Sequence, residues 1–344
     1  MQCRTTYLFL LRLTKQTKEN NMYIDTYTSD QLNNSFDFLE NFIKDKVRTW
    51  DTAPNTSLVE NQFSQSIQSM GNLEFSLLIL HAGYIPEFYL PDSSQETLYS
   101  KLIESLVCEW AKRIGFQDSF LQTQKSNKED VTIKKGNSVI VCDAKSFRLG
   151  RSQAAPNVKD TIKKQAYTTW LEQYNCDKVG GLVTFPSLHD WKKGSEAYSY
   201  FTEGNPAIMM LFYEQMSYML VKGITHQKMI DFLKNYSTIY PSASKDRNIY
   251  WKGVKKHLLT PTQNDAADYN SFMAESETII KMKVNHVLSQ LASYLIEKRS
   301  SIEYEVDQLS IEELKTMAVE AKYHNLCADI ERQQDNIIRF RPHD

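Results

Sequence analysis

Residues 130–145 read Asp-Val-Thr-Ile-Lys-Lys-Gly-Asn-Ser-Val-Ile-Val-Cys-Asp-Ala-Lys, and this stretch decides the fold. Two short apolar segments, 131–133 and 138–142, flank Gly136 and Asn137, a pair that is typical of a tight turn between antiparallel strands. The second segment carries four consecutive apolar residues, as expected of a strand that is covered on both faces. The stretch therefore predicts a hairpin whose second strand lies inside a sheet.

The sequence on either side of the hairpin predicts helices and one more strand. Residues 179–185 are apolar and predict a third strand, while residues 159–174 predict a helix. Upstream, Ser93 and Glu96 form a capping box that starts a helix, and Gly115 ends it. Helix, hairpin, helix and strand in this order predict an α/β fold with a mixed β-sheet flanked by helices.

The chain divides into four parts by composition and pattern. Residues 1–22 are basic and Thr-rich, and we expect a loose tail there. Residues 23–90 predict a helical N-terminal region, and residues 91–206 hold the α/β core. Residues 207–344 predict a mainly helical C-terminal region.

Two stretches of the C-terminal region carry more specific predictions. Residues 207–220 are apolar, rich in Met and aromatic residues, and spaced as in a helix, which predicts a core helix or a dimer helix. Residues 236–270 contain two prolines and predict connecting loops.

Composition and charge exclude several classes of protein. The 344 residues include 40 Lys and Arg against 42 Asp and Glu, a net charge of −2, and 41% of them are hydrophobic, which is typical of a globular protein. Residues 121–170 carry 10 basic against 4 acidic residues, a net charge of +6, whereas residues 301–335 carry 3 against 9, a net charge of −6. The first segment suits a polyanion and the second does not, although solvated faces show the same charge runs.

Cysteine usage and hydropathy bear on the compartment. The five cysteines are widely spaced and form no C-x-x-C pair, so they indicate neither a disulfide framework nor a zinc site. No stretch is apolar and long enough for a signal peptide or a membrane-spanning helix. We therefore expect a cytoplasmic protein.

The hairpin also brings acidic and basic side chains together. Asp130 begins its first strand and Asp143 ends its second, and these two ends are neighbours in an antiparallel pair. Lys145, two residues further on, points to the same face as Asp143. Two close carboxylates repel each other unless a cation binds, and their oxygens suit Mg²⁺. This layout fits metal-dependent hydrolysis of a phosphodiester, with Lys145 acting on the attacking water or on the developing charge. A simpler explanation of the same three residues is that they are surface charges at the ends of strands.

Three motifs in the right order favour the hydrolytic interpretation over simple charges at strand ends. Residues 143–149, residues 94–101 and residues 157–160 resemble the HindIII-like family of type II restriction endonucleases, and the resemblance covers residues 85–175 best. It implies the PD-(D/E)-x-K nuclease fold. It also implies a homodimer that cuts short palindromic duplex DNA with Mg²⁺, for which Mn²⁺ substitutes. In such an enzyme, residues 91–206 would be the nuclease core, and residues 207–344 would serve dimerisation or wrap DNA. Glu129 stands where the motif has proline.

The resemblance implies roles residue by residue. Asp130 and Asp143 would bind the metal together with the carbonyl of Ala144, and Lys145 would be the catalytic lysine. Glu96 is a further catalytic candidate because many nucleases of this fold hold a helix glutamate near the metals, although its capping box alone explains a glutamate there. The residues expected to contact DNA are Arg148, Arg151, Asn157, Asp160 and Lys163.

The sequence thus predicts a type II restriction endonuclease that acts on double-stranded DNA. Its partner in the same system would be a DNA methyltransferase, not held in a stable complex, and we expect no membrane partner. One alternative is a repair or junction-resolving nuclease of the same fold, which cuts DNA structures instead of sequences. Another is a DNA-binding protein without cleavage, whose binding would be indifferent to Mg²⁺ and to Asp143→Asn.

Overall fold

The computed structural model of the chain describes residues 23–47, 56–89, 93–122, 127–148, 163–186, 196–260, 262 and 265–340. The expected tail, residues 1–22, lies outside this range. The described chain divides into two compact units, one ending at His286 and one beginning at Val287.

The strands are β1 (Tyr84–Ile85), β2 (Phe120–Leu121), β3 (Val131–Lys135), β4 (Ser138–Ala144), β5 (Phe147–Arg148), β6 (Asp177–Phe185) and β7 (Ile208–Phe212). The helices are α2 (Ser29–Val47), α3 (Thr56–Gln68), α4 (Asn72–His81), α5 (Ser94–Arg113), α7 (Lys164–Glu172), α8 (Glu196–Thr202), α9 (Tyr213–Val221), α10 (His226–Lys234), α11 (Tyr236–Ile239), α12 (Arg247–Val254), α13 (Asp265–Asp307) and α14 (Ile311–Phe340). The described residues also contain two short helical turns, η1 (Ile24–Thr26) and η3 (Lys255–Leu259).

The central sheet has five strands in the order β2-β3-β4-β6-β7. The first three are antiparallel, and β4, β6 and β7 are parallel. Lys135 pairs with Ser138, so that Gly136 and Asn137 alone form the turn, and Gly136 has a φ of 53°, which glycine adopts without steric cost. The predicted hairpin, its turn and the mixed sheet are confirmed.

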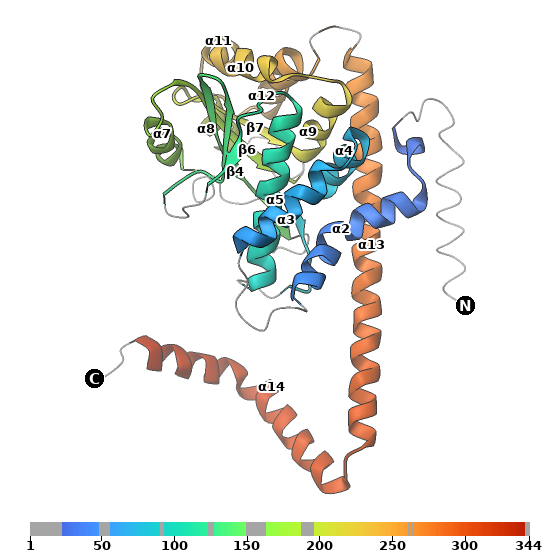
Figure 1. Cartoon of the computed structure of the whole chain (residues 1–344). Helices are drawn as coiled ribbons and strands as arrows, with labels where there is room; N and C mark the ends of the chain where they lie inside the picture. The colour runs from blue at the N-terminus through green and yellow to red at the C-terminus, as the bar shows by residue number, and fades with distance from the viewer. Residues whose placement is uncertain are drawn as a thin grey trace. The chain divides into compact units, whose positions relative to one another are not determined.

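Helices flank this sheet. The helix α5 packs against β3 and β4, and α7 packs against β4 and β6 (Figure 1). The side chain of Ser93 accepts a hydrogen bond from the N–H of Glu96 at 3.3 Å at the start of α5, and Gly115, with a φ of 116°, follows its last turn. The apolar face of α5 is buried, and each large side chain such as Leu102 stabilises the fold by about 1.5–3 kcal/mol. The helix predicted from its capping box is confirmed.

The prediction of a helix over residues 207–220 is wrong in its first part. Residues 208–212 form β7, which pairs in parallel with β6, and α9 begins only at Tyr213. All five residues of β7 are buried, and a short apolar run is as typical of a buried strand as of a buried helix, so periodicity does not separate the two. The central sheet therefore takes its last strand from beyond residue 206.

The prediction of loops over residues 236–270 is also wrong. This stretch holds α11, α12, η3 and the start of α13. Its aromatic residues pack instead of lying in solvent: the rings of Tyr240 and Tyr250 stack with centroids 5.4 Å apart. Pro241 lies between α11 and α12, where it separates two helices and interrupts neither.

The second unit contains the end of α13 and the helix α14. Ser310 and Glu313 cap α14 reciprocally, with the N–H of Ser310 donating to the Glu313 carboxylate at 2.8 Å and the N–H of Glu313 donating to Ser310 Oγ at 3.3 Å. Within the described ranges, no helix has both the length and the apolar character that crossing a bilayer requires.

Gly181→Ala is expected to destabilise the protein by about 2–3 kcal/mol, because overpacking a full core forces its neighbours to move. A Cβ at this position in β6 would lie 2.4 Å from Cδ1 of the fully buried Tyr167 of α7. Gly71→Ala is the matched control, since a Cβ there meets nothing within 4 Å. Urea unfolding measures both variants, and equal shifts would contradict this account of the packing between β6 and α7.

Candidate functional site

The two aspartates of the hairpin lie side by side at one end of the sheet. The N–H of Asp130 donates to the carbonyl of Cys142 at 3.0 Å, which places Asp130 next to Asp143 across the β3–β4 pair. The N–H of Ala144 donates to Oδ2 of Asp130 at 2.9 Å and fixes the direction of that carboxylate. The structure thus brings together the two carboxylates that the spacing placed at neighbouring strand ends.

Lys145 joins this pair. Its Nζ lies 2.6 Å from Oδ1 of Asp143, and its N–H donates to the carbonyl of Thr184 at 3.1 Å. The second contact extends the pairing of β4 with β6 by one residue. Lys145 is therefore held by the sheet and by an ion pair with the aspartate two residues before it.

Burial dominates the electrostatics of the centre. Burial raises the pKa of Asp143 to about 7, Lys145 opposes this effect, and the negative charge of Asp130 adds to it. Burial also works against the charge of Lys145, but the carboxylates of Asp143 and Asp130 together leave its pKa raised. The lysine is thus held as an ammonium group, while the aspartate next to it resists ionisation.

A third carboxylate, that of Glu104 on α5, lies within electrostatic range of Asp130. Glu104 is buried and accepts hydrogen bonds from Nζ of Lys101 at 2.5 and 2.6 Å. Burial raises the pKa of Glu104 to about 8, with a further contribution from the charge of Asp130 and an opposing one from Lys101. The motifs in the sequence did not point to Glu104. A glutamate inside the apolar run Leu102-Ile103-Glu104-Ser105-Leu106 was the available signal, because a core-facing carboxylate needs a partner.

Glu96, the glutamate singled out from the sequence, pairs with Arg148 of β5. Its Oε1 accepts from Nε of Arg148 at 3.1 Å and lies 2.9 Å from a second guanidinium nitrogen, Nη2. The strand β5 pairs in parallel with β1, and the hydroxyls of Ser100 and Ser146 are 3.3 Å apart. The start of α5 is thereby tied to the segment that follows β4.

The remaining residues expected to contact DNA are placed only in part. Lys163 is exposed at the N-terminal end of α7. Arg151, Asn157 and Asp160 lie outside the described residues.

The donor set suits a hard cation. Asp130, Asp143 and the carbonyl of Ala144 offer oxygen alone, which Mg²⁺ prefers, and Mg²⁺ usually keeps several water ligands. In the described part of the chain, no group of three or more His, Cys, Asp or Glu side chains is placed to hold a metal by itself. Two carboxylates and one backbone carbonyl fit an ion whose other ligands are water and phosphate.

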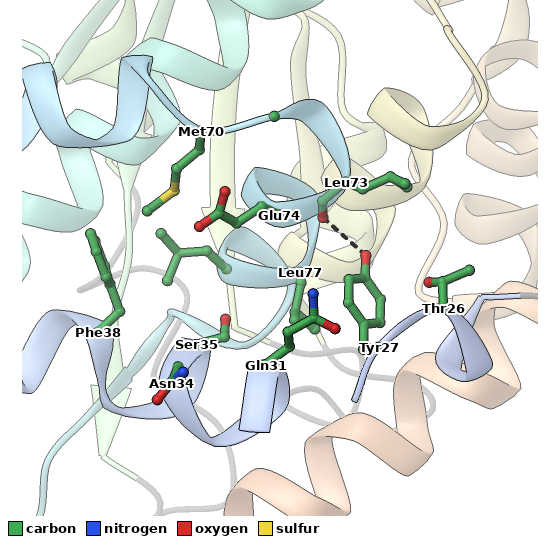
Figure 2. Close-up of a pocket in the computed structure, with 12 residues that line it drawn as sticks. Thr26, Tyr27, Gln31, Asn34, Ser35, Phe38, Met70, Leu73, Glu74 and Leu77 are labelled. Carbon is green, nitrogen blue, oxygen red and sulfur yellow. Dashed lines mark hydrogen bonds between the residues drawn. The ribbon is translucent and has the colours of Figure 1, made fainter. Parts of the chain in front are cut away.

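A separate pocket of about 510 Å³ lies between α2 and α4 (Figure 2). It is lined by apolar side chains such as Phe38, Met70 and Leu77, with Glu74 as its one acidic residue. This pocket contains none of the residues around Asp143 and lacks a pair of carboxylates, so it offers no phosphodiester chemistry.

Comparison with known proteins defines the class. The family model described as HindIII restriction endonuclease matches residues 40–324, and the chain therefore belongs to the HindIII restriction endonuclease family, whose members are type II site-specific deoxyribonucleases. The type II restriction enzyme HindIII of Haemophilus influenzae (strain ATCC 51907 / DSM 11121 / KW20 / Rd) is a similar protein. The two are 26% identical over 288 residues, which cover 80% of this chain and 89% of that enzyme.

Glu104→Gln is expected to stabilise the metal-free protein increasingly as the pH rises. Because the folded-state pKa is raised from 4.5 to about 8, the unfolded chain ionises this carboxyl first, and the penalty on the folded state grows between these two values. Glutamine removes the penalty, so the gain in Tm is small at pH 5 and larger at pH 8.5. Thermal unfolding at both pH values measures it.

The control is Glu109→Gln, also on α5, which breaks a 2.8 Å ion pair with Arg113 and should lower Tm at both pH values. A Tm difference for Glu104→Gln that is the same at pH 5 and pH 8.5 would contradict the electrostatic account.

Proposed function

We propose that this protein hydrolyses both strands of duplex DNA at a short palindromic sequence and requires Mg²⁺ for the reaction. Its membership of the HindIII restriction endonuclease family gives the class of reaction. The observation that carries the proposal is the contact of Lys145 Nζ with Asp143 at 2.6 Å, beside Asp130 at the neighbouring strand end. These are the groups that metal-assisted phosphodiester hydrolysis needs.

The chain's own residues then have distinct tasks. Asp130, Asp143 and the carbonyl of Ala144 would hold Mg²⁺, which when bound supplies an activated water and neutralises charge on the scissile phosphate. Because its pKa is raised, Lys145 enters the reaction as an ammonium group. It donates hydrogen bonds to the attacking water or to a phosphate oxygen and stabilises the negative charge that develops there.

The carboxyl groups of the centre need a cation to ionise together. Three carboxylates, those of Asp130, Asp143 and Glu104, stand against the two ammonium groups of Lys101 and Lys145. Burial raises the pKa of Asp143 to about 7 and that of Glu104 to about 8, so these carboxyls do not all ionise near neutral pH without a bound cation. A bound Mg²⁺ would favour the ionised form of Asp143 and attract the scissile phosphate, which supports the proposed metal requirement.

The two glutamates of α5 compete for the role of helix carboxylate. The resemblance predicts Glu96, whose carboxylate pairs with Arg148, whereas Glu104 is the one whose charge acts on Asp130. In the proposed complex, Arg148 contacts a DNA phosphate and Glu96 orients it, in addition to the catalytic role predicted for Glu96. Cleavage by Glu96→Gln and Glu104→Gln, measured side by side, distinguishes the two.

Incubation with unmethylated phage DNA is expected to give discrete fragments with Mg²⁺ and none with EDTA. Lys145→Ala should lower the rate by about 10²–10⁴-fold, because it removes the charge that acts on the attacking water or phosphate. The control Lys134→Ala changes a lysine of β3 on the same hairpin and should cleave normally.

Absence of cleavage by folded protein on several DNAs would refute the proposal. Cutting of branched DNA alone would identify the structure-specific nuclease instead. Binding unaffected by Mg²⁺ and by Asp143→Asn, without cleavage, would identify the DNA-binding protein. The fragment ends would give the recognition sequence and the cut position.

A palindromic target implies a homodimer. The described chain holds a single pair of hairpin aspartates, and two antiparallel DNA strands related by a twofold axis need two such centres. The helix α14 offers a surface for a second copy, with four apolar residues at helical spacing and 51–72% exposed: Val319, Tyr323, Leu326 and Ile330. Residues 301–335 have a net charge of −6, so this surface suits a protein and not DNA.

Leu326→Glu combined with Ile330→Glu is expected to shift the protein from dimer to monomer, since each change places a charge in a desolvated apolar contact. The control Ala328→Glu adds one charge on the opposite side of α14, where the dimer should persist. Sedimentation velocity at micromolar concentration measures both variants. Dimers of unchanged strength in the double variant would exclude this surface.

The restriction role implies a second enzyme. A DNA methyltransferase that modifies the same sequence would protect the host DNA, and we propose that it acts without forming a stable complex with this protein.

A further inference from the structure

We propose that Tyr213 is a positioning residue for Lys145, an inference that rests on the proposed function because it assumes a catalytic role for that lysine. The hydroxyl of Tyr213 donates to the carbonyl of Lys145 at 2.8 Å and accepts from Oγ1 of Thr184 at 3.1 Å. The side chain of Tyr213 is 1% exposed, so water does not compete for these contacts.

The carbonyl of Lys145 needs this donor because the sheet cannot supply one. Ala144 pairs with Thr184 in the parallel ladder, and the N–H of Lys145 donates to the carbonyl of Thr184 at 3.1 Å. In a parallel ladder, the next hydrogen bond would run from the N–H of residue 186 to the carbonyl of Lys145. Residue 186 is proline and has no N–H. Tyr213 therefore supplies the hydrogen bond that the ladder lacks.

The ring of Tyr213 is itself held in place. It is the first residue of α9, directly after the buried strand β7. A Cβ at Gly83 would lie 2.4 Å from the Tyr213 ring, which shows how closely the ring packs on that backbone. The carbonyl of the same glycine accepts the N–H of Phe147 at 2.9 Å. The tyrosine thus packs beside the segment that carries the lysine.

These contacts fix the backbone on both sides of Lys145. Its N–H bonds to β6, its carbonyl bonds to Tyr213, and Phe147 bonds to Gly83. The direction of the Lys145 side chain follows from this backbone, and a misplacement of about 1 Å in an active site costs up to about 100-fold in rate. The hydroxyl of Tyr213 acts on the rate through Lys145, without contact with the substrate.

Tyr213→Phe tests the inference, since it removes the hydroxyl and keeps the ring. Single-turnover cleavage with Mg²⁺ is expected to slow by about 10- to 100-fold, while the affinity for DNA, measured without Mg²⁺, stays unchanged. The control Tyr240→Phe removes a similarly buried hydroxyl that donates to the carbonyl of Tyr250 at 2.8 Å, far along the chain from the site. It should lower Tm as much and cleave at the wild-type rate.

A rescue experiment separates positioning from stability. Adding Pro186→Ala to Tyr213→Phe restores a backbone N–H opposite the carbonyl of Lys145, and the double variant should regain much of the lost rate. Thr184→Val is a second, milder variant that leaves the tyrosine in place, and it should slow cleavage in the same direction with a smaller effect.

The outcomes distinguish a failure of the proposed function from a failure of the role proposed for Tyr213. Wild-type protein that does not cleave overturns the proposed function and this inference with it. Wild-type cleavage that is abolished in Lys145→Ala but unchanged in Tyr213→Phe overturns the inference alone. Equal losses of rate in Tyr213→Phe and Tyr240→Phe, without rescue by Pro186→Ala, also overturn it and leave Tyr213 a structural residue.

Discussion

The backbone pairing of β3 with β4 is the constraint on which the rest of the site depends. The pairing of Val131 with Cys142 leaves Asp130 and Asp143 as neighbours, and the hydrogen bond from Ala144 to Asp130 closes that end of the hairpin. A slip of one residue would turn every side chain of the strand to the other face. The two-residue turn at Gly136 prevents such a slip, because its length allows a single register. A turn remote from the chemistry thereby sets the separation of the carboxylates.

The site is less stable than the core that surrounds it. Burial raises the pKa of both Asp143 and Glu104, which means that their ionised forms oppose folding of the metal-free protein. The buried strands β4, β6 and β7 and the apolar face of α5 supply the opposing stabilisation. This arrangement is a stability cost that a structural role would not explain, since a protein gains nothing from burying more acidic than basic groups unless a cation or a reaction uses them.

The sequence was sufficient for features that depend on neighbours along the chain. The hairpin, the capped start of α5 and the adjacency of Asp130 and Asp143 follow from local spacing, and the structure confirms them. The strand β7 was missed because five buried apolar residues suit a strand or a helix equally well, and only the pairing with β6 decides. Glu104 was missed because its electrostatic role depends on the charge of Asp130, which the start of β3 places near it. Glu96 was found, but its pairing with Arg148 depends on β5 lying against β1.

Residue roles transferred from a relative also depend on contacts with residues that are distant in the sequence. The run Asp143-Ala144-Lys145 is recognisable on its own, yet the position of its lysine depends on Pro186 at the end of β6 and on Tyr213 at the start of α9. A proline there ends the ladder one hydrogen bond early, and the carbonyl left over belongs to the lysine itself. A hydroxyl from a segment about seventy residues later fills the gap. Since a buried carbonyl without a donor is costly, proline and tyrosine at these positions depend on each other, and a chain that lacks the proline has no need of the tyrosine hydroxyl.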